Sequence, residues 1–104
     1  MKTSELTGAA LDWAVAKCEG REMRAWRTYK RLNQTNYSTD WSQGGPIIER
    51  ETIDVMFEGP EWYAYMRWEN KTLQYDGATP LIAATRCYVA SKLGDEVEIP
   101  EELK

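Results

Sequence analysis

The sequence contains no histidine, the residue on which many catalytic and metal sites depend. Its absence excludes Ser-His and Cys-His nucleophile systems and histidine metal ligands. The GxSxG, P-loop and HExxH patterns are also absent. A hydrolase built on paired carboxylates is the remaining enzymatic alternative, with candidates at Asp40, Glu49, Glu51 and Asp54. Because charged side chains usually face water, we predict no catalytic residues and a binding protein rather than an enzyme.

Cysteine is scarce: Cys18 and Cys87 are far apart, and each falls within a helical pattern. A secreted disulfide scaffold would have a denser set, and two separated cysteines cannot build a zinc site alone. We therefore predict two reduced, buried thiols in a cytoplasmic protein, with no bound metal and no cofactor. No apolar run approaches the length of a membrane span, and residues 1–10 do not resemble a signal peptide.

Aromatic residues are plentiful but unevenly chosen, with five tryptophans and six tyrosines against one phenylalanine. Tryptophan and tyrosine carry a polar atom on an apolar body, so they suit interfaces and half-open pockets as well as cores. The length of 104 residues allows one domain, residues 1–104, with an acidic tail at 95–104. A net charge of −4 makes nucleic acid an unfavourable partner.

Two helices have clear signals at both ends. The first, Thr7–Glu19, begins with a threonine suited to the N-cap and ends before Gly20, which fits the position after the helix. The second, Thr79–Leu93, has a threonine at the N-cap, a proline at the first helical position and Gly94 after its last residue. Apolar residues recur at helical spacing in both segments.

Strand patterns occupy the region between these helices. Thr52–Phe57, Glu61–Trp68 and Thr72–Tyr75 alternate in polarity and are separated by turn residues, which predicts an antiparallel sheet. Both faces of Glu61–Trp68 are aromatic, so either a helix covers the second face or that face receives a ligand or a partner subunit. We predict the α+β class: two helices packed on a small antiparallel sheet in a single compact domain.

The segment Arg21–Leu32 fits either a helix or a strand, and its central residues favour a strand. It carries five basic residues and one glutamate in a chain that is acidic overall. A solvated strand face explains this charge, and a phosphate-facing patch is the alternative.

We interpret the chain as organised around Tyr37–Glu49, which reads YSTDWSQGGPIIE. We expect Gly44, Gly45 and Pro46 to interrupt any helix, with the proline starting a short one. The segment is therefore predicted as a loop, either a structural turn or a ligand site. For a ligand site, Trp41 would stack on a flat group, the two glycines would approach an anion closely, and Arg86 would grip its oxygens. The predicted ligand-binding residues are Ser38, Thr39, Asp40, Trp41, Gly44, Gly45, Pro46 and Arg86.

Three blocks of the sequence stand out: TSELTGAALDWAVAKCEG at Thr3–Gly20, YSTDWSQGGPIIERE at Tyr37–Glu51 and TPLIAATRCYVASKLGDEVEIPEEL at Thr79–Leu103. In wording and order they resemble the NinX-type family of small proteins from lambdoid phages and prophages. The resemblance implies an accessory phage protein in the cytoplasm of a bacterial host. It implies no particular activity and transfers no functional residue.

Two functions agree with this setting. The first is a non-catalytic binder of a small anionic or nucleotide-derived ligand, which would sequester a host defence signal. The alternative is an inhibitor or adaptor that contacts a host or phage protein. Because so small a protein has little room to enclose a ligand alone, we expect a homo-oligomer. The anchors for the alternative would be Trp62, Tyr63, Tyr65 and Trp68.

Overall fold

The computed structural model describes residues 1–21 and 35–104, so the strand predicted at Arg21–Leu32 lies outside them except for its first residue. The helices of the described part are α1 (Gly8–Cys18), α3 (Trp41–Glu51) and α4 (Pro80–Leu93), with 3-10 turns η1 (Thr3–Glu5) and η2 (Glu101–Leu103). The strands are β1 (Asp54–Glu58), β2 (Glu61–Trp68) and β3 (Lys71–Gly77). The α+β class is confirmed, but the prediction of two helices is wrong, since this part of the chain has three.

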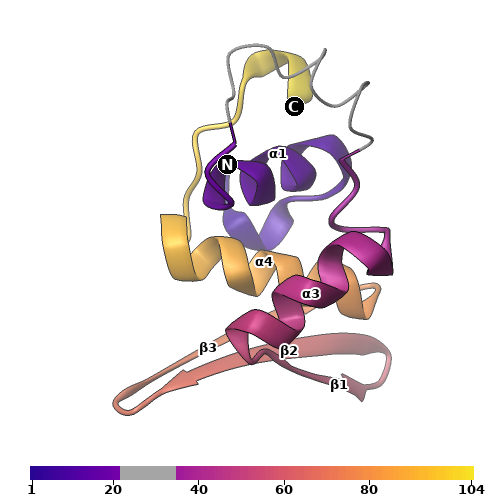
Figure 1. Ribbon diagram of the computed structural model, residues 1–104, viewed down its shortest axis with the longest axis vertical. Helices are drawn as coiled ribbons and strands as arrows, with labels where there is room; N and C mark the ends of the chain where they lie inside the picture. Colours follow the sequence, from indigo (N-terminus) through magenta and orange to yellow (C-terminus); the bar gives the residue numbers. More distant parts are fainter. Residues whose placement is uncertain (22–34) are drawn as a thin grey trace.

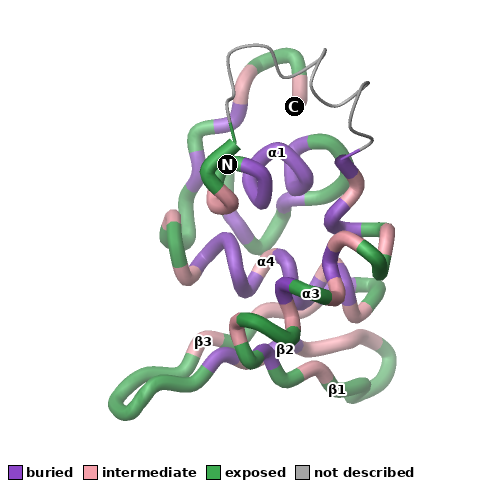
Figure 2. Tube along the Cα trace, in the orientation of Figure 1, coloured by how far each residue is buried: buried purple, intermediate pink, exposed green. Residues whose placement is uncertain are grey.

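The three strands form an antiparallel meander in the order β1-β2-β3. All three predicted strands are confirmed, although β1 starts two residues later and β3 runs two residues further than expected. Because β1 begins at Asp54, opposite Tyr65, its ladder with β2 does not reach Trp68. The end of the β2–β3 hairpin therefore extends beyond β1, and its residues are mostly exposed (Figures 1 and 2).

All three helices lie on the same side of the sheet (Figure 1). Helix α4 runs between the sheet and α1, so most of its residues are buried (Figure 2). Its alanines allow close approach on both sides, and its caps match the sequence: the Thr79 side chain accepts a hydrogen bond from the Ile82 amide at 3.1 Å. In α1 the N-cap is also a threonine, as predicted, but the side chain of Thr7 makes no capping bond.

Helix α3 corrects the expectation of a loop at Tyr37–Glu49. The side chain of Asp40 caps it by accepting bonds from the amide and hydroxyl of Ser42, at 2.9 and 2.7 Å. The helix then continues through Gly44 and Gly45, which have no positive φ, and through Pro46. Pro46 has no N–H to donate to the carbonyl of Ser42, four residues earlier, so one helical hydrogen bond is lost. Ser42 and Pro46 are both exposed, and water can therefore bond this carbonyl.

The buried apolar residues form one cluster that joins the helices to the sheet. Tyr88 is the largest fully buried side chain. In the predicted acidic tail, Val97 and Ile99 are buried against this core. The tail also pairs with the start of the chain through a bridge between Lys2 and Glu96. Both cysteines are free thiols: Cys87 is buried and Cys18 is half-buried, and burial raises the pKa of each to about 12.

Candidate functional site

Two of the residues predicted to bind a ligand have their polar groups engaged by the fold. Ser38 is only 1% exposed, and both its amide and its hydroxyl donate to Asp12 Oδ1, at 2.9 and 2.8 Å. Arg86 donates from Nε to the carbonyl of Leu6 and from Nη1 to the carbonyl of Asp76, both at 2.8 Å. Burial lowers the pKa of the Arg86 guanidinium. These contacts tie the turn before α3 to α1, and they tie α4 to the segment before α1 and to the end of β3.

The residues around the Gly-Gly-Pro sequence also have structural roles in α3, as its cap and at its packing contacts. Hydrogen bonds from Ser42 hold the pKa of the exposed Asp40 carboxyl below its usual value. The amide of Gly44 donates to the Asp40 carbonyl at 2.9 Å, as in any helix. A Cβ on Gly44 would lie 2.4 Å from the Tyr37 carbonyl oxygen and 2.6 Å from Leu81 Cδ2, so this glycine lets α3 pack closely against its neighbours.

Three predicted residues do meet at one small cavity, which we call the Trp41 cavity. Its volume is about 190 Å³, and Ser38, Thr39 and Trp41 line it together with the start of α4. The Trp41 side chain is 56% exposed. Gly44, Gly45, Pro46 and Arg86 do not line the cavity. The structure therefore brings part of the predicted set together, without the arginine that was expected to hold an anion.

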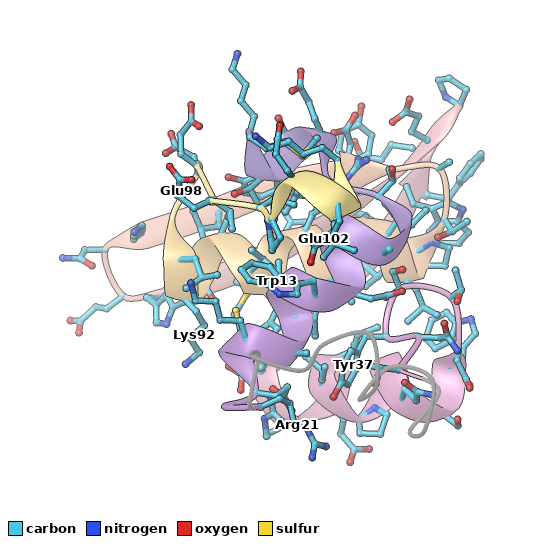
Figure 3. All side chains as sticks on the ribbon, turned by 90° about the horizontal axis from the view of Figure 1, so that it is seen from above. Trp13, Arg21, Tyr37, Lys92, Glu98 and Glu102 are labelled. Carbon is cyan, nitrogen blue, oxygen red and sulfur yellow. The ribbon has the colours of Figure 1, made fainter. Side chains whose placement is uncertain are left out.

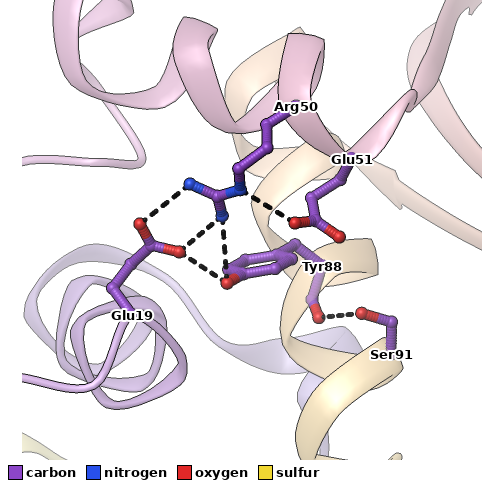
Figure 4. Close-up of polar contacts among 5 residues, drawn as sticks. All are labelled: Glu19, Arg50, Glu51, Tyr88 and Ser91. Carbon is purple, nitrogen blue, oxygen red and sulfur yellow. Dashed lines mark hydrogen bonds and ion pairs between the residues drawn. The ribbon is translucent and has the colours of Figure 1, made fainter.

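A second polar cluster joins Glu19, Arg50 and Tyr88, which come from three separate segments (Figure 4). The Arg50 guanidinium holds the Glu19 carboxylate with two bonds, at 3.2 and 2.6 Å, and the Tyr88 hydroxyl donates to the same carboxylate at 2.5 Å. Arg50 Nε also donates to Glu51 at 2.9 Å. The fork geometry of arginine suits this bidentate contact. The cluster fixes the end of α1 against α3 and α4, and the sequence analysis did not identify it.

The titration of this cluster follows from its contacts. Partial burial alone would raise the pKa of Glu19, but the hydrogen bonds from Arg50 and Tyr88 outweigh burial and hold it below its ordinary value. Burial and the bond to Glu19 raise the pKa of the Tyr88 hydroxyl. The Glu19 carboxylate is thus stabilised in its charged form, which suits a structural contact.

A larger open cleft, which we call the Trp68 cleft, lies where the β2–β3 hairpin extends beyond β1. Its volume is about 510 Å³. The buried Met66 and the 46% exposed Trp68 come from β2, Lys71 from the start of β3, and Ser91 and Lys92 from the end of α4. Lys92 extends from the end of α4 toward the edge of the molecule (Figure 3). The cleft therefore combines an exposed indole with cationic and hydroxyl groups from separate elements.

Charge in the Trp68 cleft is mixed, but its carboxylates are already paired. Asp54 forms an ion pair with Arg67, and Glu51 forms one with Arg50. Lys71 Nζ lies 5.9 Å from the centre of the Trp68 ring. Among the described residues, neither Lys71 nor Lys92 forms an ion pair. Neither lysine was among the predicted binding residues, and the cleft arises because β1 begins only at Asp54, so that its ladder with β2 stops at Tyr65, short of Trp68.

The aromatic residues of β2 divide between the two faces of the sheet. Trp62 and Trp68 lie on the face toward α4, and Tyr63 and Tyr65 lie on the opposite face, as the strand register requires. They cannot act together as one set of anchors. Within residues 1–21 and 35–104, no group of three or more cysteines and carboxylates could hold a metal ion.

These features define a small α+β domain, with three described helices on one face of an antiparallel meander and an open cleft at the free end of its hairpin. The family model described as Bacteriophage P22, NinX matches residues 2–92, and the chain belongs to this family. The resemblance seen in the sequence is thus confirmed, and the protein is a phage accessory protein. Comparison with curated proteins gives no match. In the part of the chain that the structure describes, no helix is long and apolar enough to cross a membrane.

Proposed function

We propose that this phage accessory protein is a non-catalytic binder of a small anionic ligand, such as a nucleotide-derived molecule, and that the ligand lies in the Trp68 cleft. One observation supports this proposal above the others: an exposed indole and two lysines line the same cleft of about 510 Å³. That volume falls within the range of roughly 300–1,000 Å³ that small-molecule sites occupy.

The chemistry of the cleft suits a flat group that carries negative charge. A base-like ring stacked on Trp68 would gain roughly 1–3 kcal/mol, by analogy with bases on aromatic side chains. Lys71 and Lys92 would act as point charges for phosphate or carboxylate oxygens, and neither has a carboxylate partner to displace among residues 1–21 and 35–104. The hydroxyl group of Thr52 adds a hydrogen-bond donor at the wall of the cleft, whereas that of Ser91 already donates to the Tyr88 carbonyl at 2.6 Å and offers only its oxygen as an acceptor.

In a bacterial host, such a protein would act by sequestering a nucleotide-derived defence signal rather than by changing it. Binding by stacking and ion pairing needs no metal and no cofactor. The cleft is open to solvent on one side, and a second copy of the chain would enclose the ligand better than one copy can. A homo-oligomer that closes the cleft is therefore part of the proposal.

Calorimetric titration with a panel of cyclic and linear nucleotides tests this function. Trp68→Ala should weaken binding about tenfold or more, because it removes the stacking surface. Lys71→Gln and Lys92→Gln should each weaken it and reduce its dependence on salt. Trp41→Ala is the matched control, because it removes a similarly exposed indole, 56% against 46% for Trp68, from the other cavity.

The titration distinguishes a ligand site at Trp68 from one at Trp41, and it tests whether a ligand binds at all. If Trp41→Ala abolishes binding and Trp68→Ala does not, the site is the predicted segment around Trp41 and our position for it is wrong. If the parent protein binds nothing on the panel, the ligand-binding function itself is wrong. The second candidate function is then contact with a host or phage protein. The face of the sheet opposite the helices favours it, because no described element covers that face (Figure 1).

A further inference from the structure

The face of the sheet opposite α4, which we call the outer face, is not covered by any described element. The helices all lie on the other side, and the sheet forms one end of the molecule (Figure 1). The strand register puts Met56, Tyr63 and Tyr65 at the centre of this face. Met56 is 47% exposed and stands directly opposite Tyr63. A sheet can face water on one side, but this one presents an apolar and aromatic centre there.

The aromatic centre of the outer face is held in place by its neighbours. The Tyr65 hydroxyl donates to Glu58 Oε1 at 3.1 Å, and the Arg67 guanidinium lies 5.2 Å from the centre of the Tyr65 ring. Tyrosine offers a large, rigid contact area that loses little conformational entropy on binding. The position of the Tyr65 ring is thus fixed in the unbound protein, so a partner would find this surface preorganised.

The charge of the outer face is strongly one-sided. Arg67 is the single cation that the register puts there, and its ion pair with Asp54 leaves Glu58, Glu61 and Asp76 in excess. Glu58 and Glu61 stand directly opposite each other, an arrangement that destabilises a sheet. Hydrogen bonding and repulsion from Asp76 raise the pKa of Glu61. Arg86, whose Nη1 bonds the carbonyl of Asp76, offsets part of this repulsion, but the carboxylates on this face still outnumber the one arginine that the register puts there.

We propose that the outer face binds a protein partner whose contact surface presents arginine and lysine around an apolar patch. Cations from such a partner would relieve the repulsion among Glu58, Glu61 and Asp76, while its apolar groups cover Met56 and Tyr63. Nucleic acid would be repelled by the same carboxylates. A two-fold dimer through this face would bring carboxylates against carboxylates, so a second copy of the chain is also unfavourable there. The ion pair between Asp54 and Arg67 borders both this surface and the Trp68 cleft, but Met56, Glu58, Glu61, Tyr63 and Asp76 do not line the cleft. The inference therefore goes beyond the ligand-binding function.

Isotope-labelled full-length protein should be titrated with a short synthetic peptide in which arginine alternates with leucine. A second peptide, with glutamate in place of arginine, is the control for charge. The arginine peptide should shift the backbone resonances of Met56, Tyr63 and Tyr65 in a saturable way, and added salt should weaken binding. The glutamate peptide should cause no such shifts.

Neutral variants separate binding from folding. Glu58→Gln combined with Glu61→Gln removes two of the crowded charges while keeping side-chain shape, so it should raise the melting temperature and weaken peptide binding about tenfold. Glu98→Gln combined with Glu102→Gln changes net charge equally at exposed positions in the C-terminal segment, at the end of the molecule away from the sheet (Figures 1 and 3). This control should bind the peptide like the parent.

The proposal is overturned if the arginine peptide does not bind, or if both peptides bind equally. It is also overturned if the shifts fall outside the outer face, or if both pairs of neutral variants weaken binding alike, since a general charge effect would then explain the result. Shifts at the outer face that depend on protein concentration without peptide would assign it to self-association instead. None of these outcomes depends on nucleotide binding at Trp68, so the two proposals fail or succeed separately.

Discussion

The two regions with an exposed tryptophan, the Trp41 cavity and the Trp68 cleft, differ in what their polar neighbours do. Near Trp41, Ser38 is bonded to Asp12 and Asp40 caps α3. Around Trp68, Lys71 and Lys92 form no ion pair within the described residues. A polar residue in the sequence therefore indicates a binding site only if the folded protein does not already supply its hydrogen-bond or ion-pair partners. The following predictions test this difference, beginning with the largest effect.

Gly44→Ala should destabilise the fold by about 2–3 kcal/mol or more, because the new methyl group collides with a backbone carbonyl of residue 37 and a methyl of Leu81. Gly45→Ala is the matched control within the same helix. Its nearest atom would be a ring carbon of Trp41 at 3.7 Å, so the change should be neutral or stabilise by up to about 1 kcal/mol through helix propensity. Urea unfolding measures both free energies. Equal effects would show that Gly44 is not needed for packing.

Arg86→Lys should cost about 1–3 kcal/mol, because one ammonium cannot satisfy the carbonyls of both Leu6 and Asp76. Lys92→Gln, at the exposed end of the same helix, should change the free energy of unfolding by less than about 0.5 kcal/mol. Thermal melting without ligand provides the measurement. If Arg86→Lys melts like the parent but loses a ligand, Arg86 is a binding residue, as the sequence first suggested.

Tyr88→Phe should give the smallest loss, about 0.5–1.5 kcal/mol near neutral pH, because it removes one hydrogen bond to Glu19. Because the pKa of Glu19 is lower in the folded state than in the unfolded state, the charged carboxylate stabilises the fold at neutral pH. This stabilisation is lost as the pH falls below the unfolded-state pKa and through the lower folded-state pKa. The variant should therefore lose less stability on acidification than the parent. Urea midpoints at neutral and acidic pH check this, and parallel pH curves for the two proteins would contradict it.

Local signals in the sequence predicted α1, α4 and the three strands. The threonine N-caps, the glycines after both helices and the alternation of β2 all concern residues close together in the chain. Helix α3 was missed because the reason for Gly44 is tertiary: a Cβ there would meet atoms of Tyr37 and of Leu81, and the second belongs to α4. The general rule that Gly-Gly-Pro breaks helices was outweighed by this packing and by the Asp40 cap.

The candidate sites were less predictable than the fold. Thr39 and Trp41 do meet at a cavity, but the carbonyl that Arg86 Nε contacts lies 80 residues away in sequence, so its engagement could not be read from spacing. The Trp68 cleft depends on where β1 begins, and the sequence misplaced that boundary by two residues. Boundaries of strands are set by pairing with other strands, and here the start of β1 at Asp54 leaves the Trp68 cleft open beside it.

The distribution of tryptophans gives this protein separate optical reporters. Trp13 is 6% exposed within the core, whereas Trp41 and Trp68 lie at two different surfaces. Indole emission shifts to longer wavelength in water, and soluble quenchers reach only exposed rings. Quenching with iodide should thus be strong for the two surface rings and weak for Trp13. Replacing one surface tryptophan at a time by phenylalanine would let the fluorescence of the unlabelled protein report which of these surfaces a bound molecule covers.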